Sequence, residues 1–142
     1  MGDEAERFRD PAVIERVLRD TDVWAVVGLG GDPARPAYGV ARFLLAHGKR
    51  IVPVHPRAPE VLGEQGYRTL AEIPFPVDVV DIFRRSQDAG RFADEAVQIG
   101  ASAVWLQLGV IDEEAATRAA AAGLDVVMDT CPAIEAPRLG VE

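Results

Sequence analysis

The sequence holds few residues of several chemically important types: one cysteine, one lysine, two tyrosines and two histidines among 142 residues. A single cysteine cannot close an internal disulfide, so the cytoplasm is the expected compartment. No apolar run approaches the roughly 20 residues that a membrane-spanning helix needs. The N-terminal stretch "MGDEAERFRD" carries charges of both signs and no apolar core, so we expect no secretory signal.

Basic residues are also scarce, with 15 Lys and Arg against 23 Asp and Glu and a net charge of -8. Proteins that bind duplexes usually carry a basic stripe, and an acidic chain is repelled by an anionic membrane surface. We therefore expect neither nucleic acid nor membrane as a partner. One small anionic ligand stays compatible with this charge, because a few amides and cations can hold it. The length and a hydrophobic content of 49% predict a single soluble domain, residues 1–142, with a sizeable core.

Apolar runs alternate with amphipathic helical patterns along the chain. Strands are expected at 22–29, 50–56, 77–83, 102–109 and 125–132, and helices at 10–20, 37–48, 87–100 and 112–123. Asp10 is the expected N-cap of the first helix, and the tail "AIEAPRLGVE" is expected to form a short capping segment. The alternation predicts an α/β fold, a Rossmann-like doubly wound five-stranded parallel sheet in the order 3-2-1-4-5 with helices on both faces. Its ligand would bind at the carboxyl ends of the strands, near a switch point between strands 1 and 4.

A glycine-rich stretch, "GLGGDPARPAYG", separates the first expected strand from the helix that follows. Gly28 permits a tight turn, and Gly30 and Gly31 let backbone amides approach an anion closely. The N-terminus of the next helix offers unpaired N–H groups and a positive dipole end, which suits a pyrophosphate. The spacing matches neither G-x-G-x-x-G, since Pro33 stands three residues after Gly30, nor a P-loop. A plain turn between strand and helix is therefore the competing interpretation.

The end of the second expected strand carries a cation where an NAD site usually carries a carboxylate. His55, Pro56 and Arg57 stand near the position of the Asp or Glu that binds the ribose diol of NAD. A cation there indicates a phosphorylated ribose, either in NADP or in CoA with its 3′-phosphate. The alternatives are a solvated surface arginine at 57 and a histidine packed on the sheet at 55.

Further motifs follow in order: "VVGL", "VPVHP", "VLGEQGYRTLAEIP", "VDVVDIFRR", "WLQLGV" and "EAATRAAAAGLDVVMDTC", with a late E-x-x-R. Together they resemble the small stand-alone CoA-binding proteins, a family similar to the CoA-binding domain of the succinyl-CoA synthetase alpha subunit. The resemblance covers about residues 10–138. It implies a Rossmann-like fold whose cofactor is CoA or acyl-CoA.

The resemblance also implies which residues contact the cofactor. The loop from Gly28 to Tyr38 resembles the family's phosphate-binding loop, and the ends of strands 2, 3 and 5 resemble segments along the cofactor's path. The implied cofactor-binding residues are Gly28, Gly30, Gly31, Arg35, Pro36, Tyr38, His55, Pro56, Arg57, Phe83, Arg84, Arg85, Met128, Asp129, Thr130 and Cys131. The chain reads V-H-P where the family often reads V-N-P, and D-T-C where it often reads D-R-C. The second departure removes a cation from the end of strand 5.

Side chains in a recognisable catalytic arrangement do not stand out. The related synthetase uses a phosphorylated histidine in a further domain, whereas His47 lies at a helix end and His55 at a strand end. No Ser/His/Asp order and no cluster with metal-ligand spacing is evident. We therefore interpret the chain as a non-catalytic CoA or acyl-CoA binding protein; a second copy and a separate enzyme both stay open as partners. The alternative is an NADP-dependent oxidoreductase or other nucleotide-cofactor enzyme. Such an enzyme usually needs a Tyr or Lys near the nicotinamide as proton donor, and the sequence offers only Tyr38, Tyr67 and Lys49, the last at a strand start away from the expected site.

Cys131 follows the last expected strand, at the edge where the pantetheine arm of CoA is expected to run. A lone cysteine is usually a small buried hydrophobe. The alternative hypothesis places its sulfur near the CoA thiol, where a mixed disulfide forms under oxidation. Close by in the sequence, Glu135 and Arg138 stand at i and i+3 and are expected to pair with each other.

Overall fold

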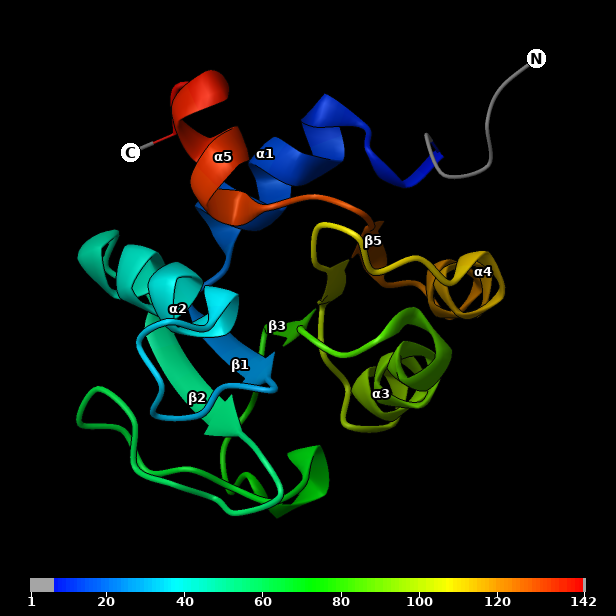
Figure 1. The fold of residues 1–142 in the computed structure, drawn as a ribbon. Helices are drawn as coiled ribbons and strands as arrows, with labels where there is room; N and C mark the ends of the chain where they lie inside the picture. Colours follow the sequence, from blue (N-terminus) through cyan, green and yellow to red (C-terminus); the bar gives the residue numbers. More distant parts are fainter. Residues whose placement is uncertain (1–6, 142) are drawn as a thin grey trace.

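Five parallel strands form one sheet in the computed structural model, which describes residues 7–141 (Figure 1). The strands are β1 (Val23–Val27), β2 (Arg50–Val54), β3 (Val79–Ile82), β4 (Ala103–Leu106) and β5 (Asp125–Val127). Nearly all of their residues are buried, as the continuous apolar runs predict for a sheet covered on both faces. The first six residues lie outside the described residues. They belong to the N-terminal stretch for which we expect no secretory signal, so the structure does not test that expectation.

Helices cover both faces of this sheet (Figure 1). The helices α1 (Pro11–Asp20), α2 (Pro36–Ala46) and α5 (Pro132–Arg138) pack on one face, and α3 (Ser86–Gln98) and α4 (Glu113–Ala121) pack on the other. The start of α1 is as predicted, because the Asp10 side chain accepts a hydrogen bond from the Ala12 N–H at 2.9 Å. No helix within residues 7–141 is long and apolar enough to span a bilayer.

Two tryptophans anchor the core under α1, α2 and α5. The rings of Trp24 and Trp105 have centroids 5.5 Å apart, and both side chains are fully buried. The Trp105 Nε1–H donates a hydrogen bond to the Thr130 backbone oxygen at 2.8 Å. The core therefore fixes the turn that follows β5, which forms one side of the site described below.

The fold class is confirmed, but the predicted strand order is wrong. The order is β2-β1-β3-β4-β5 rather than 3-2-1-4-5, so the switch point lies between β1 and β3 rather than between strands 1 and 4. Pro53 gives a physical reason, since proline has no N–H to donate and is confined to outer strands or bulges. Pro53 lies opposite Val26 of β1, and the outer side of β2 carries only a bridge between Val54 and Tyr67. The chain then reaches β3 without an α-helix, through a single 3-10 turn, η2 (Leu70–Glu72).

The C-terminal part also differs from the expectation. The last strand ends at Val127 rather than at 132, because Asp129 adopts a left-handed φ of 54° and turns the chain. Pro132 then opens a true helix, α5, where only a capping segment was expected, and this helix contains Pro137. The expected pair is confirmed, with Arg138 Nη1 at 3.4 Å from Glu135 Oε1.

Candidate functional site

A cleft of about 970 Å³ runs along the carboxyl ends of all five strands. Neighbouring strands lie about 4.8 Å apart, so the cleft extends over roughly 19 Å from β2 to β5. This is the edge at which doubly wound sheets bind their ligands. The expected cofactor-binding residues that line it are Gly28, Gly30, Gly31, Arg35, Pro36, His55, Arg57, Phe83, Arg84, Arg85 and Cys131.

The other expected residues lie outside the cleft. Tyr38 is half-buried and packs against the core under α2, and Pro56 lines a smaller hollow of about 160 Å³ beside the cleft. Asp129 and Thr130 line a separate hollow of about 610 Å³ next to β5. Met128 is fully buried among core residues on the α3 and α4 face of the sheet.

The glycines after β1 serve two different purposes. Gly28 has a φ of 98°, and a Cβ at this position would lie 2.8 Å from the Phe83 carbonyl oxygen, so the turn needs glycine. At Gly30 a Cβ would meet only the His55 ring, at 3.5 Å, and at Gly31 it would meet nothing within 4 Å. The absence of side chains at 30 and 31 therefore keeps this wall of the cleft open beside His55.

Three helices begin at the cleft without a capping side chain. Arg35 is the N-cap of α2, Arg85 that of α3 and Cys131 that of α5, and none of these side chains makes a capping hydrogen bond to its helix. In α4, by contrast, Asp112 accepts a hydrogen bond from the Ala115 N–H at 3.0 Å. An uncapped N-terminus leaves backbone N–H groups and the positive end of the helix dipole available to an anion.

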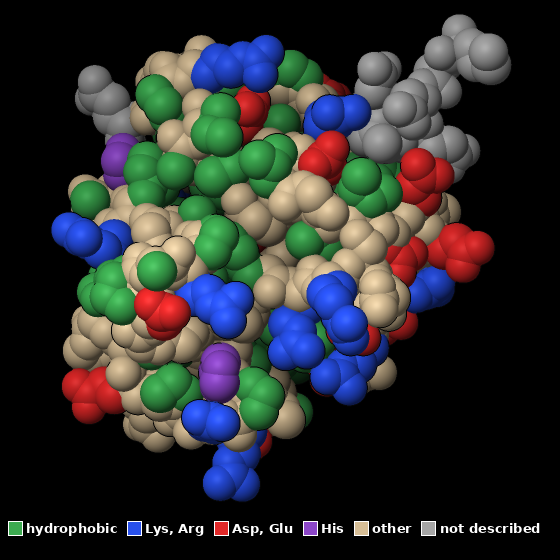
Figure 2. All heavy atoms as spheres, in the orientation of Figure 1, with side chains coloured by type: hydrophobic (Ala, Val, Ile, Leu, Met, Phe, Trp, Pro, Cys, Tyr) green, Lys and Arg blue, Asp and Glu red, His purple; other side chains and the backbone are tan. Residues whose placement is uncertain are grey.

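Four arginines surround the cleft of this acidic chain: Arg35, Arg57, Arg84 and Arg85. Figure 2 shows several basic side chains on this face of the molecule. Arg35 lies 3.9 Å from Asp32, and Arg85 lies 3.0 Å from Asp88. Arg57 and Arg84 form no ion pair within the described part of the chain, so their charges are available to a ligand.

His55 presents a neutral ring to the cleft. Its Nδ1 accepts a hydrogen bond from the Arg57 backbone N–H at 3.1 Å, which assigns the ring proton to Nε2, on the side of Gly30. Burial lowers the pKa of the His55 imidazole, and the positive charges of Arg57 and Arg84 lower that pKa further. The residue therefore supplies an N–H donor to the cleft.

Gln107, directly after β4, is a residue that the sequence reasoning missed. It lines the cleft and is only 6% exposed, and its Oε1 is buried without a hydrogen-bond partner among residues 7–141. Buried polar atoms are rarely left unpaired, so this oxygen fits a donor from a ligand. The available signal was an amide immediately after an apolar strand, in "WLQLGV", at the edge where ligands bind.

The residues considered as proton donors for a nicotinamide lie elsewhere. Neither Tyr38 nor Tyr67 lines the cleft. Lys49 precedes β2 at the opposite edge of the sheet, where its Nζ donates to the backbone oxygens of Leu18, at 2.6 Å, and Thr21. Within residues 7–141 no group of three or more His, Cys, Asp or Glu side chains is arranged to hold a metal ion.

The fold and the cleft define a doubly wound α/β domain that can hold an extended anionic ligand at the carboxyl edge of its sheet. The chain belongs to the CoA binding domain family, whose model matches residues 22–137. It is 36% identical over 120 residues to "Uncharacterized protein YneT" of Bacillus subtilis (strain 168). This alignment covers 84% of this chain and 89% of that protein.

Solved structures support the same relationship. The redesigned protein Prb (PH1109 protein redesigned for binding) has a TM-score of 0.88 and 36% identity over 94% of both chains. A hypothetical protein from Pyrococcus horikoshii OT3 has a TM-score of 0.86 and 34% identity over 92% of both chains. The dinucleotide forming acetyl-coenzyme A synthetase 1 of Ca. Korarchaeum cryptofilum has a TM-score of 0.69 and 25% identity over 82% of this chain but 28% of its own. The predicted family resemblance is confirmed.

Proposed function

We propose that this chain binds CoA or acyl-CoA in the cleft along the carboxyl ends of its strands, and that it catalyses no reaction by itself. The observation that carries the proposal is a pair of arginines, Arg57 and Arg84, that have no carboxylate partner among residues 7–141. They lie beside a wall of glycines in a chain of net charge -8. Membership of the CoA binding domain family supports the same ligand.

The cleft offers contacts for the phosphates and the pantetheine arm of CoA. The pyrophosphate fits the amides of the 28–38 loop and the uncapped start of α2. The 3′-phosphate fits Arg57 at the end of β2. The pantetheine arm then extends past Phe83 and Gln107 toward Cys131. Along this path, Gln107 Oε1, which has no partner among residues 7–141, can accept a hydrogen bond from an amide N–H of the pantetheine. The hypothesis that the Cys131 sulfur meets the CoA thiol stays a prediction.

Isothermal titration calorimetry with CoA, dephospho-CoA and NADP tests the proposal. We expect the wild-type protein to bind CoA more tightly than the other two ligands. Arg57→Ala should weaken CoA binding roughly 10-fold or more, because a charge-assisted hydrogen bond contributes about 1.5–3 kcal/mol. The same substitution should barely change the affinity for dephospho-CoA, which lacks the 3′-phosphate.

Arg42→Ala is the matched control, because Arg42 is exposed on α2 outside the cleft and its loss changes the net charge equally. It should leave all three affinities unchanged. Equal losses for CoA and dephospho-CoA in Arg57→Ala would remove the 3′-phosphate assignment. Tighter binding of NADP than of CoA would overturn the proposed ligand.

A further inference from the structure

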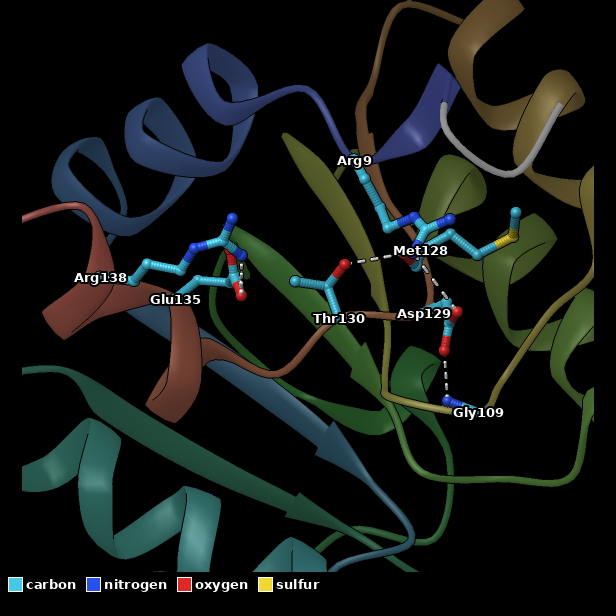
Figure 3. A network of polar contacts seen from close by, with 7 residues as sticks. All are labelled: Arg9, Gly109, Met128, Asp129, Thr130, Glu135 and Arg138. Carbon is cyan, nitrogen blue, oxygen red and sulfur yellow. Dashed lines mark hydrogen bonds and ion pairs between the residues drawn. The ribbon is translucent and has the colours of Figure 1, made fainter. Parts of the chain in front are cut away.

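The cleft continues into the second hollow at its β5 end. This β5 hollow, of about 610 Å³, lies between the start of α1, the turn after β5 and α5. Leu108 and Cys131 line both the cleft and the β5 hollow, so they form the junction between them. Figure 3 shows Arg9 and Asp129 on one side of this region and Glu135 and Arg138 on α5 across from them.

We propose that the β5 hollow receives the acyl group of an acyl-CoA and selects uncharged acyl groups. This inference rests on the proposed function, because the CoA part has to occupy the cleft. With the phosphates at the β1 and β2 loops, the pantetheine arm points along the sheet toward β5. Its thioester end then reaches the junction at Leu108 and Cys131, directly beside the β5 hollow.

Hydrocarbon side chains supply much of the surface of the β5 hollow. Ile14 and Leu139 contribute from α1 and from the end of α5. Leu108 and Ile134 are 59% and 52% exposed, which is unusual for large apolar side chains, and both line this hollow. A hydrocarbon group bound there would remove part of their surface from water, which favours binding.

The charged groups of the β5 hollow are already paired with each other. Arg9 Nη1 lies 3.8 Å from Asp129 Oδ2, and Arg138 Nη1 lies 3.4 Å from Glu135 Oε1. Asp10 also lines the hollow and caps α1. An acyl group with its own carboxylate would therefore meet three carboxylates and two arginines that already have partners. This arrangement disfavours an acidic acyl group, in contrast to Arg57 and Arg84 of the cleft, which form no ion pair within residues 7–141.

Two polar side chains of the turn after β5 also form hydrogen bonds within the protein, as Figure 3 shows. Asp129 Oδ1 accepts a hydrogen bond from the Gly109 N–H at 2.7 Å, and the Thr130 hydroxyl donates to the Met128 backbone oxygen at 2.8 Å. These bonds hold the turn after β5, so the Asp129 and Thr130 side chains already have partners within the protein. The chemistry of the hollow thus matches an acyl group made of carbon and hydrogen beyond its carbonyl.

Calorimetry with CoA, butyryl-CoA and succinyl-CoA tests this inference. Wild-type protein should bind butyryl-CoA roughly tenfold more tightly than CoA, a gain below that of complete burial of three hydrocarbon carbons. Succinyl-CoA, of similar length but acidic, should bind no more tightly than CoA. Ile134→Glu should abolish most of the butyryl preference while the affinity for CoA stays within about twofold, because Ile134 does not line the cleft.

Ile111→Glu is the matched control, since Ile111 is 41% exposed and lines neither hollow. It should keep the full preference for butyryl-CoA. Equal wild-type affinities for CoA and butyryl-CoA would overturn the acyl site while leaving CoA binding intact, and tightest binding of succinyl-CoA would overturn the selection of uncharged groups. Failure of wild-type protein to bind CoA itself would instead overturn the proposed function, and the acyl site with it.

Discussion

Asp81 places a carboxyl group in the centre of the sheet. It is 0% exposed, lies in register between Val26 of β1 and Trp105 of β4, and neither of its oxygens has a hydrogen-bond partner within the described chain. Burial raises the pKa of the Asp81 carboxyl well above its ordinary value. The folded protein therefore favours the protonated acid, and ionisation of this group opposes folding.

This residue predicts a pH dependence of stability with a definite sign. The unfolded chain releases the Asp81 proton at a lower pH than the folded chain, so stability falls as pH rises from the ordinary aspartate pKa toward the raised one. Urea unfolding of wild type and Asp81→Asn across this range should show a steeper decline in wild type. The two slopes of unfolding free energy against pH should differ by at most about 1.4 kcal/mol per pH unit, the value for a difference of one bound proton between the folded and unfolded chains.

The comparison uses the slope because a buried asparagine also changes the stability at every pH. Asp20→Asn, at an exposed position, removes the same formal charge and should leave the wild-type slope unchanged. Parallel pH profiles for wild type and Asp81→Asn would show that Asp81 ionises alike in the folded and unfolded chains, contrary to this account.

At the scale of elements, the connection from β1 to α2 carries the cleft glycines and leads into the N-terminus of α2. It also passes beside His55, which follows β2. Gly30→Val should weaken CoA binding roughly tenfold, because the added side chain would extend beside the His55 ring and narrow the space for a phosphate. The fold should persist, since the nearest contact of the new Cβ is an ordinary 3.5 Å. Calorimetry with CoA measures the loss, and thermal unfolding checks the fold.

Gly39→Val provides the comparison for Gly30→Val. Gly39 is exposed on α2 outside the cleft, and a Cβ there would meet nothing within 4 Å. Its CoA affinity should equal that of wild type. Equal affinities for Gly30→Val and wild type would remove the pyrophosphate from this loop.

Most elements could be predicted from sequence because each is an apolar run or an amphipathic pattern with local end signals, such as Asp10 and Pro11 at the start of α1. The strand order depends on which strand lacks a second partner, and only Pro53 carried that information. The turn at Asp129 was not visible either, so the strand at 125–132 was predicted too long and α5 was missed. Local sequence patterns thus predict helices and strands well, but they predict poorly which strands lie next to each other in the sheet.

The candidate site divides in the same way. The loops after β1, β2 and β3 carry glycines and arginines whose chemistry is visible in the sequence, and residues of all three line the cleft. Gln107 carries no motif, and its unpaired oxygen becomes evident only when burial and hydrogen bonds are known. Leu108 likewise looks like a strand residue until its exposure at the junction with the β5 hollow is seen.

At the scale of the whole molecule, charge is distributed unevenly. The chain has a net charge of -8, yet Arg57 and Arg84 line one cleft and form no ion pair with any other described residue. Because exposed charges are screened within about 10 Å at 0.1 M salt and about 3 Å at 1 M, CoA binding should weaken as salt rises. Calorimetry at 0.1 M and 1 M KCl should show a loss of roughly tenfold in wild type.

Arg57→Ala should show a smaller salt effect than wild type, because one of the charges that attract the phosphates is gone. The exposed variant Arg42→Ala should show the wild-type effect. An affinity for CoA that does not change with salt would mean that the cleft binds its ligand without these cations.

The bridge from Tyr67 to β2 also bears on how this protein behaves at high concentration. An exposed outer strand can template pairing with strands of other molecules and so promote aggregation. Here the Tyr67 N–H donates to the Pro53 oxygen at 2.9 Å and the Tyr67 oxygen accepts from the His55 N–H at 3.0 Å. Pro53 itself has no N–H to offer an intruding strand. A neighbouring molecule must therefore displace the Tyr67 segment before it can extend the sheet at this edge, which protects the protein against ordered self-association by strand addition.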